Sequence, residues 1–255
     1  MAAKRAIFVA PFDELADPRL LARLAARAEE ACWDGFYLWD HMAYRAPVRA
    51  LLDPWVVLAA QATATERLRL GPLVTPLSRR RIHKLARETA TLDLLSDGRL
   101  DLGVGLGSDA YGELSGFGEV VDARERATLL DAGLDQLVAY WAGTFEPRPV
   151  QRPHIPIWVA ARWPNRRPVQ RAARWDGVFP IDLEPDQLAE LAGEIAQQRR
   201  DEGRAGDPYD IVVTNAAGTD PAPWEAAGAT WCLTGFSPTP RLADVRSVID
   251  AGPNG

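Results

Sequence analysis

The sequence alternates between short β-forming runs and helical patterns from one end of its 255 residues to the other. The β-forming runs are rich in branched and aromatic residues, whereas the helical patterns repeat apolar residues every three or four positions. About eight such units follow one another without a linker. The expected strands cover residues 7–10, 36–39, 68–75, 100–106, 157–160, 178–181, 211–214 and 229–234.

The expected helices carry recognisable start and stop signals. Asp17 precedes Pro18, and Asp53 precedes Pro54. An aspartate side chain accepts hydrogen bonds from the free N–H groups of a first helical turn, and proline fits there because it has no N–H to satisfy. The Asp-Gly pair at residues 176–177 ends a later helix and leads into the next strand. These signals separate the helices from the strands along the chain.

This alternation predicts an α/β fold. A right-handed helical crossover after each strand makes neighbouring strands parallel. About eight units in roughly 250 residues fit a closed (β/α)8 barrel of the TIM type, formed as a single domain over residues 1–255. An open doubly wound sheet is the alternative. The Trp-Asp-Gly sequence at residues 33–35 returns at 175–177, four units later, and this repeat favours the barrel.

Composition restricts the class of partner. Lys and Arg number 29 and Asp and Glu number 35, so the net charge is −6. A protein that binds nucleic acid usually carries a positive field, and this balance argues against such a partner. The longest charge-free apolar stretch lies between Asp53 and Glu66 and is shorter than the ~20 residues that span a bilayer. Because the apolar run at residues 6–10 is also too short for a signal peptide, we expect a cytoplasmic protein with no membrane partner.

Cysteine and histidine are sparse. The two cysteines, Cys32 and Cys232, form no disulfide framework, and we expect both to be buried free thiols. His41, His83 and His154 are far apart in the sequence. None of them has the spacing of a metal site, so no metal is predicted.

Asp40 and His41 follow the second expected strand and are the best acid–base candidates. Function in a parallel barrel collects at the carboxyl ends of the strands. An imidazole exchanges protons near neutrality, and a neighbouring carboxylate can orient the ring. A loop histidine satisfied by the backbone is the structural alternative, and the residues alone leave the two readings balanced.

Glycines follow the fourth expected strand. Residues 105–110 match the loose Gly-x-Gly-x-x-Ala form of a dinucleotide fingerprint. We reject this match, because further glycines at 112, 116 and 118 stand where the fingerprint requires a helix. Gly105 and Gly107 instead permit close approach of a flat ring or a backbone. A tight barrel corner explains them equally well.

Arginines cluster at two further positions. Arg162, Arg166 and Arg167 stand at the start of an expected helix, where free N–H groups and positive charge suit a phosphate. The run at residues 79–81 either guides an anionic tail or is exposed without a role. Three tryptophans near strand ends are candidates for the wall of a flat aromatic pocket: Trp39, Trp163 and Trp231.

Together these motifs resemble the luciferase-like monooxygenase family, whose members use flavin or deazaflavin. The resemblance covers nearly the whole chain in the family's order. It implies a TIM-type barrel, a non-covalent F420 or FMN cofactor, a small-molecule substrate and a homodimer. The segments that carry it are residues 31–41 (ACWDGFYLWDH), 53–76 (DPWVVLAAQATATERLRLGPLVTP), 92–107 (LDLLSDGRLDLGVGLG), 153–159 and 171–180 (RAARWDGVFP).

The resemblance also implies roles for single residues. His41 matches the histidine that lies close to the flavin ring and takes part in proton transfer, and Asp40 stands beside it. Val74 lies where such proteins often hold a non-proline cis peptide against the ring. The expected cofactor contacts are Val74, Thr75, Gly105, Gly107, Ala160, Ala161, Arg162, Asn165 and Arg166.

Two positions depart from the family pattern. Ala160-Ala161 replaces the Gly-Gly pair of many relatives, and the added methyl groups narrow the expected phosphate-binding site. Ser108 stands where the sugar-phosphate dehydrogenase branch has an acid, which argues against that branch.

The resemblance leaves two chemistries open. Reduced FMN supports monooxygenation and F420 supports hydride transfer. The compact set of motifs favours F420, and the arginines at residues 79–81 can pair with the acidic tail of that cofactor. The alternatives are a non-catalytic flavin-binding barrel and an unrelated barrel lyase or hydrolase that uses Asp40, His41 and Asp182 on a phosphate-bearing substrate.

Overall fold

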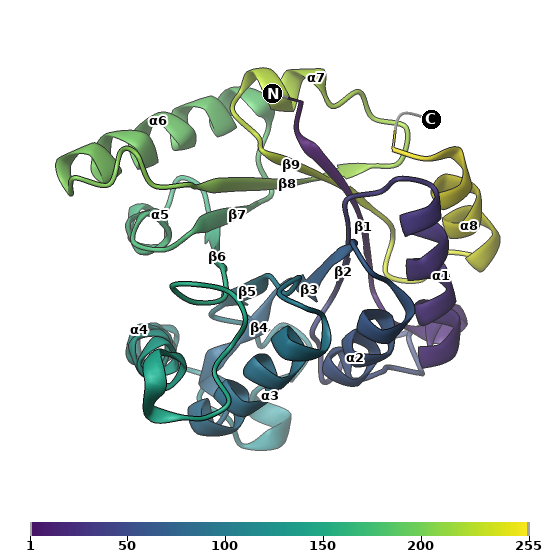
Figure 1. Ribbon diagram of the computed structural model, residues 1–255, viewed down its shortest axis with the longest axis horizontal. Coiled ribbons are helices and arrows are strands. Elements are labelled where there is room, and N and C mark those ends of the chain that lie inside the picture. The colour runs from purple at the N-terminus through teal and green to yellow at the C-terminus, as the bar shows by residue number, and fades with distance from the viewer. Residues whose placement is uncertain (1, 254–255) are drawn as a thin grey trace.

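Parallel strands form a closed barrel in the computed structural model, which describes residues 2–253 (Figure 1). The expected α/β barrel is thus confirmed, and the open doubly wound sheet is not formed. Around the barrel the strands follow the order β3-β2-β1-β9-β8-β7-β6-β5-β4. Their bounds are β1 (Lys4–Val9), β2 (Gly35–Leu38), β3 (Arg69–Pro72), β4 (Thr75–Pro76), β5 (Leu102–Gly105), β6 (Ile157–Arg162), β7 (Gly177–Ile181), β8 (Asp210–Ala216) and β9 (Trp231–Gly235).

One expected strand is broken into β3 and β4. The peptide bond between Leu73 and Val74 is cis and separates the two pieces. β3 pairs with β2, and β4 pairs with β5. A parallel bridge between Leu70 and Leu100 closes the ring. The two pieces of the third strand therefore pair with different neighbours. Val74 lies between these pieces, at the carboxyl end of the barrel.

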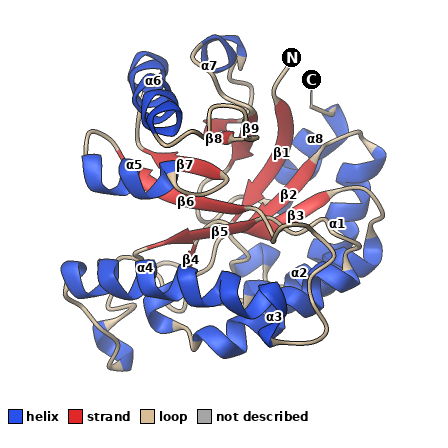
Figure 2. Ribbon diagram, turned by 60° about the vertical axis from the view of Figure 1, so that its left-hand side comes forward, coloured by secondary structure: helices blue, strands red, loops and turns tan. Residues whose placement is uncertain are grey.

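The helices lie outside the strands, as Figures 1 and 2 show from two directions. The sequence signals placed them correctly: Asp17 accepts a hydrogen bond from the Arg19 N–H at 2.8 Å, and Asp53 accepts one from the Val56 N–H at 3.1 Å. The helices are α1 (Pro18–Glu30), α2 (Pro54–Ala64), α3 (Ile82–Leu95), α4 (Ala123–Ala139), α5 (Arg166–Ala173), α6 (Pro185–Asp201), α7 (Ala222–Ala226) and α8 (Leu242–Ala251).

The barrel interior is filled by aromatic and aliphatic side chains. Trp231 is 1% exposed, and its ring centroid lies 5.5 Å from that of Trp158 and 5.8 Å from that of Tyr37. These three rings fill the space below the open end, and Phe8 and Phe179 lie above them, where they line the cavity described next. The interior is a packed core, and a cavity opens at its carboxyl end.

Three expectations about single residues need correction. Trp231 lies in the interior core and Trp163 packs against the outer core, so neither of them walls the cavity. Cys32 is exposed, contrary to the expectation, and lies with a left-handed φ of 67° in the turn after α1. Cys232 is buried as expected, and burial raises the pKa of its thiol to about 11.

Among residues 2–253 there is no helix of the length and apolar character that crossing a bilayer requires.

Candidate active site

A cavity of about 1160 Å³ opens at the carboxyl ends of the strands. It is the place where a barrel of this type carries its chemistry. Residues that follow β2, β3, β5, β6 and β7 contribute to its wall, together with residues of β8 and α7. The predicted site residues that line it are Asp40, His41, Val74, Gly105, Gly107, Ala160, Arg162 and Asn165.

His41 is oriented by a carboxylate that the sequence reading did not identify. Its Nδ1 lies 2.7 Å from Oε2 of Glu113, a residue 72 positions away on the loop after β5. Burial raises the pKa of Glu113, but hydrogen bonds from His41 and from the Met42 N–H, together with the Arg79 charge, outweigh burial and hold that pKa below its usual value. An ionised carboxylate only accepts, so Nδ1 carries the proton of the neutral ring and Nε2 carries the lone pair.

The Nε2 atom of His41 has no hydrogen-bond partner among residues 2–253. The ring is partly exposed and lines the cavity. His41 therefore presents a proton acceptor, or a donor when protonated, to a molecule in the cavity.

Asp40 has a different environment from the one expected. Its side chain is fully buried and accepts hydrogen bonds from Thr75 Oγ1 at 2.6 Å and from Arg80 Nη2 at 3.0 Å. Trp55 Nε1 donates to it at 3.3 Å, and Arg79 donates as well. The expectation that Asp40 orients the imidazole is therefore corrected: the carboxylate on the His41 ring belongs to Glu113.

Arg79 connects the two carboxylates. One guanidinium nitrogen donates to Asp40 and the other donates to Glu113, and the side chain is only 4% exposed. With Arg80 the cluster holds two positive and two negative charges, so its buried charges are balanced. Arg79 and Arg80 do not form the free basic surface expected for the run at residues 79–81, because the carboxylates of this cluster pair with both.

Val74 and the two glycines form one wall of the cavity. A Cβ atom at Gly105 would lie 2.9 Å from Val74 Cγ2 and 3.2 Å from Ala160 Cβ. Gly107 has φ of +72°, and a Cβ there would lie 2.9 Å from Pro76 Cβ. Both positions need glycine, because Val74 and Pro76 pack against them. This wall of the cavity is therefore apolar.

The β6 and β7 side of the cavity is polar. Arg162 forms an ion pair with Asp182, and both side chains are more than half exposed. Asn165 precedes α5, and its side chain forms no capping hydrogen bond, so the first N–H groups of α5 have no side-chain cap. An arginine beside free helix N–H groups is a donor set that fits a phosphate.

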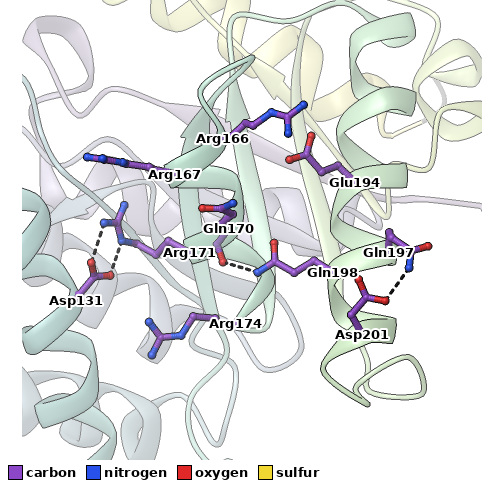
Figure 3. A pocket seen from close by; sticks show the side chains of 10 residues that line it. All are labelled: Asp131, Arg166, Arg167, Gln170, Arg171, Arg174, Glu194, Gln197, Gln198 and Asp201. Atoms are coloured by element: carbon purple, nitrogen blue, oxygen red, sulfur yellow. Dashed lines mark hydrogen bonds and ion pairs between the residues drawn. The ribbon is translucent and has the colours of Figure 1, made fainter.

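Three predicted contacts lie outside the cavity. Arg166 lines a separate groove between α5 and α6, where its side chain extends toward the helix that carries Glu194 (Figure 3). Ala161 alternates with Ala160 along β6 and therefore faces the outer core. Thr75 is buried beneath the wall as a donor to Asp40. The prediction placed these three side chains at the cavity, whereas the structure turns them away from it through the direction of α5, the alternation of β6 and the hydrogen bond from Thr75 to Asp40.

Comparison with known proteins identifies the family. A sequence model described as luciferase-like monooxygenase matches residues 6–231. The chain belongs to this family, as its motifs and its barrel had indicated.

Individual relatives agree with this assignment. An uncharacterised protein of Mycobacterium tuberculosis is 34% identical over 204 residues, which cover 72% of this chain and 70% of that protein. The oxygenase component of the flavin-dependent trigonelline monooxygenase of Acinetobacter baylyi is 29% identical over 207 residues, 72% of this chain and 53% of that protein. The fold is that of the coenzyme F420-dependent tetrahydromethanopterin reductase of Methanopyrus kandleri, with a TM-score of 0.78, 17% identity and coverage of 98% and 97% of the two chains.

Proposed function

We propose that this protein is an oxidoreductase that binds F420 or FMN non-covalently in the cavity and acts on a small organic substrate. The observation that carries this proposal is the His41–Glu113 pair at the cavity wall. Catalysis, more than binding alone, explains a buried carboxylate that fixes one tautomer of a partly exposed imidazole at the cavity wall. Named relatives with flavin and with F420 chemistry support both cofactors.

In this proposal each wall of the cavity binds a different part of the cofactor. Val74, Gly105 and Ala160 form the apolar surface against which the flat ring system lies. Arg162 and the first N–H groups of α5 hold the phosphate. The bound cofactor supplies hydride transfer or oxygen activation, according to which of the two it is.

His41 transfers the proton. Its Nε2 accepts a proton from the substrate or returns one to it, while Nδ1 stays bonded to Glu113. As the ring becomes positively charged, the Glu113 carboxylate stabilises it at 2.7 Å. The hydrogen bonds from His41 and from the Met42 N–H, with the Arg79 charge, keep Glu113 ionised against the effect of burial, and the Arg79 hydrogen bond holds the carboxylate in place.

The rival functions lose support at particular residues. A hydrolase or lyase that uses Asp40 requires an accessible carboxylate at this position, but the Asp40 side chain is fully buried among arginines. A barrel unrelated to the luciferase-like family is contradicted by the family match over residues 6–231.

We also propose that the protein is a cytoplasmic homodimer. The α2 helix has an apolar composition on all sides, and Val56 on its outer side is 65% exposed. On the neighbouring α3, Leu94 and Leu95 are 42% and 46% exposed. We propose that these exposed apolar side chains of α2 and α3 contribute to the subunit interface.

The decisive test is a spectroscopic titration of the purified chain with FMN and, separately, with F420. We expect saturable binding of one of them with a shifted absorption spectrum. His41→Ala should retain this binding and lose oxidation or reduction of the bound cofactor by any substrate of the native protein. Absence of binding for both cofactors contradicts the proposal.

A further inference from the structure

The cavity has two chemically different ends. The end formed after β6 and β7 holds Arg162, Asn165 and Asp182 and is assigned above to the phosphate. The other end is formed by the loops after β2 and β5 and is lined by aromatic side chains. A pocket for one drug-sized ligand typically measures about 300–1,000 Å³, so a cavity of about 1160 Å³ can accommodate a second small molecule beside a cofactor.

Aromatic rings at this second end form a continuous row. The Tyr111 ring centroid lies 4.8 Å from that of Tyr44, and the Tyr44 centroid lies 5.2 Å from that of His41. Phe12 packs against Tyr44, with 5.3 Å between their ring centroids, and is itself 1% exposed. Trp39 completes the wall at 5.7 Å from His41. Tyr111 is 39% exposed, so the row reaches from solvent to the candidate acid–base residue.

Arg45 is the free positive charge at this end. Its guanidinium carbon lies 5.7 Å from the centroid of the Tyr111 ring. Among residues 2–253 its side chain makes no hydrogen bond and no ion pair, whereas Arg162, the other arginine in the cavity wall, is paired with Asp182. Burial and the neighbouring Tyr111 raise the pKa of Tyr44, so its hydroxyl is neutral near pH 7 and offers Arg45 no negative partner.

We propose that Tyr44, Tyr111 and Arg45 form the substrate subsite and that it takes a planar aromatic molecule with an anionic substituent such as a carboxylate. The inference rests on the proposed function, because it assigns the substrate to the end of the cavity that the cofactor phosphate does not use. The aromatic ring stacks on the tyrosines, and the anion pairs with Arg45. Bound in this way, the substrate ring lies beside His41.

The same residues disfavour two other substrate classes. An aromatic row without a fixed positive charge attracts organic cations, but the unpaired guanidinium of Arg45 repels them. An aliphatic acid satisfies Arg45 and gains little from the faces of Tyr44 and Tyr111. Selectivity thus requires both the ring and the charge.

The experiment uses three probes of similar size: benzoate, benzamide and cyclohexanecarboxylate. Isothermal titration calorimetry measures their binding to the full chain, alone and after saturation with FMN or F420. We expect benzoate to bind at least 10-fold more tightly than either of the other two. Arg45→Gln should weaken benzoate at least fivefold and leave benzamide unchanged, whereas Tyr111→Leu should weaken both aromatic probes.

Arg49→Gln is the matched control, because Arg49 is an exposed arginine of the same loop and does not line the cavity. It should leave all three affinities unchanged, and unaltered circular dichroism of each variant confirms the fold. Equal affinity for benzoate and benzamide, or a benzoate preference that survives in Arg45→Gln, overturns the proposed subsite. The cofactor titration is read separately: binding of FMN or F420 without benzoate selectivity overturns only the subsite, and benzoate selectivity without cofactor binding overturns only the redox function.

Discussion

Glu113 accepts a hydrogen bond from Nδ1 of His41 across 2.7 Å, although 72 positions separate the two residues in the sequence. The contact fixes the tautomer of the imidazole and directs its free nitrogen to the cavity. Glu113 in turn is bound by Arg79, which also binds Asp40. In the proposed function, proton transfer by His41 therefore depends on a buried network of charges behind the cavity wall.

The first prediction concerns Glu113. Glu113→Gln keeps an acceptor for Nδ1 but removes the charge that stabilises the protonated ring, so we expect turnover to fall about 10²-fold, a typical effect of impaired general acid–base catalysis. Cofactor affinity should stay unchanged. Single-turnover absorbance of the bound cofactor measures both quantities. Glu119→Gln, on the same loop and outside the cavity wall, is the control and should behave like the native protein.

The second prediction concerns acid stability. The pKa of Glu113 lies below its usual value in the folded protein, so this group stabilises the fold at pH values above its unfolded pKa of ~4.5. That contribution is lost as the pH falls from there through the folded pKa. Urea unfolding at pH 7 and pH 4 should show a smaller difference in unfolding free energy for Glu113→Gln than for the native chain. An identical difference in both proteins would mean that Glu113 is not held in its ionised form.

The third prediction separates adjacent arginines. Arg79→Gln leaves two buried carboxylates without their shared partner, so it should lower the unfolding free energy by about 3–5 kcal/mol. Arg81 is exposed, and its side chain makes no ion pair within residues 2–253. Arg81→Gln should therefore change stability by less than about 0.5 kcal/mol. Denaturant unfolding of the two variants measures the contrast, and equal effects would contradict the buried network.

The fourth prediction tests the proposed phosphate-binding site. Arg162→Ala removes a charged donor from the cavity and should weaken cofactor binding by about 1.5–3 kcal/mol, roughly 10- to 150-fold. Arg166→Ala should leave the affinity unchanged, because Arg166 lies in the groove between α5 and α6. Titration of the cofactor absorption gives both affinities. The reverse result would move the phosphate to the outer groove.

The fifth prediction tests the dimer. Val56→Glu places a charge on the exposed apolar side of α2, in the proposed interface, and should convert the protein to a monomer. Light scattering coupled to size-exclusion chromatography measures the mass. Val150 is 42% exposed but lies outside the two helices, so Val150→Glu should keep the native mass. A native protein that is already monomeric would remove the basis of the prediction.

Much of the fold was predictable because its signals are local. Capping by Asp17 and Asp53, proline at helix starts and glycine at turns each act within a few residues, and the structure confirms these boundaries. The position of His41 at the carboxyl end of a strand was predictable for the same reason, since strand order and direction follow from the alternation. The cis peptide before Val74 came from the resemblance, not from local residues.

The sequence by itself determined the barrel, its open end and the presence of an imidazole there, because hydrophobic period and turn chemistry are short-range properties. Only the tertiary structure decided which carboxylate bonds to His41 and which arginines are buried. It also decided which side chains of β6 and α5 face the cavity and which face away from it. Those outcomes depend on contacts between residues far apart in the chain, such as Glu113 with His41 and Arg79 with Asp40. Such pairs form only when closure of the barrel brings separate loops together, and no periodicity within one segment encodes them.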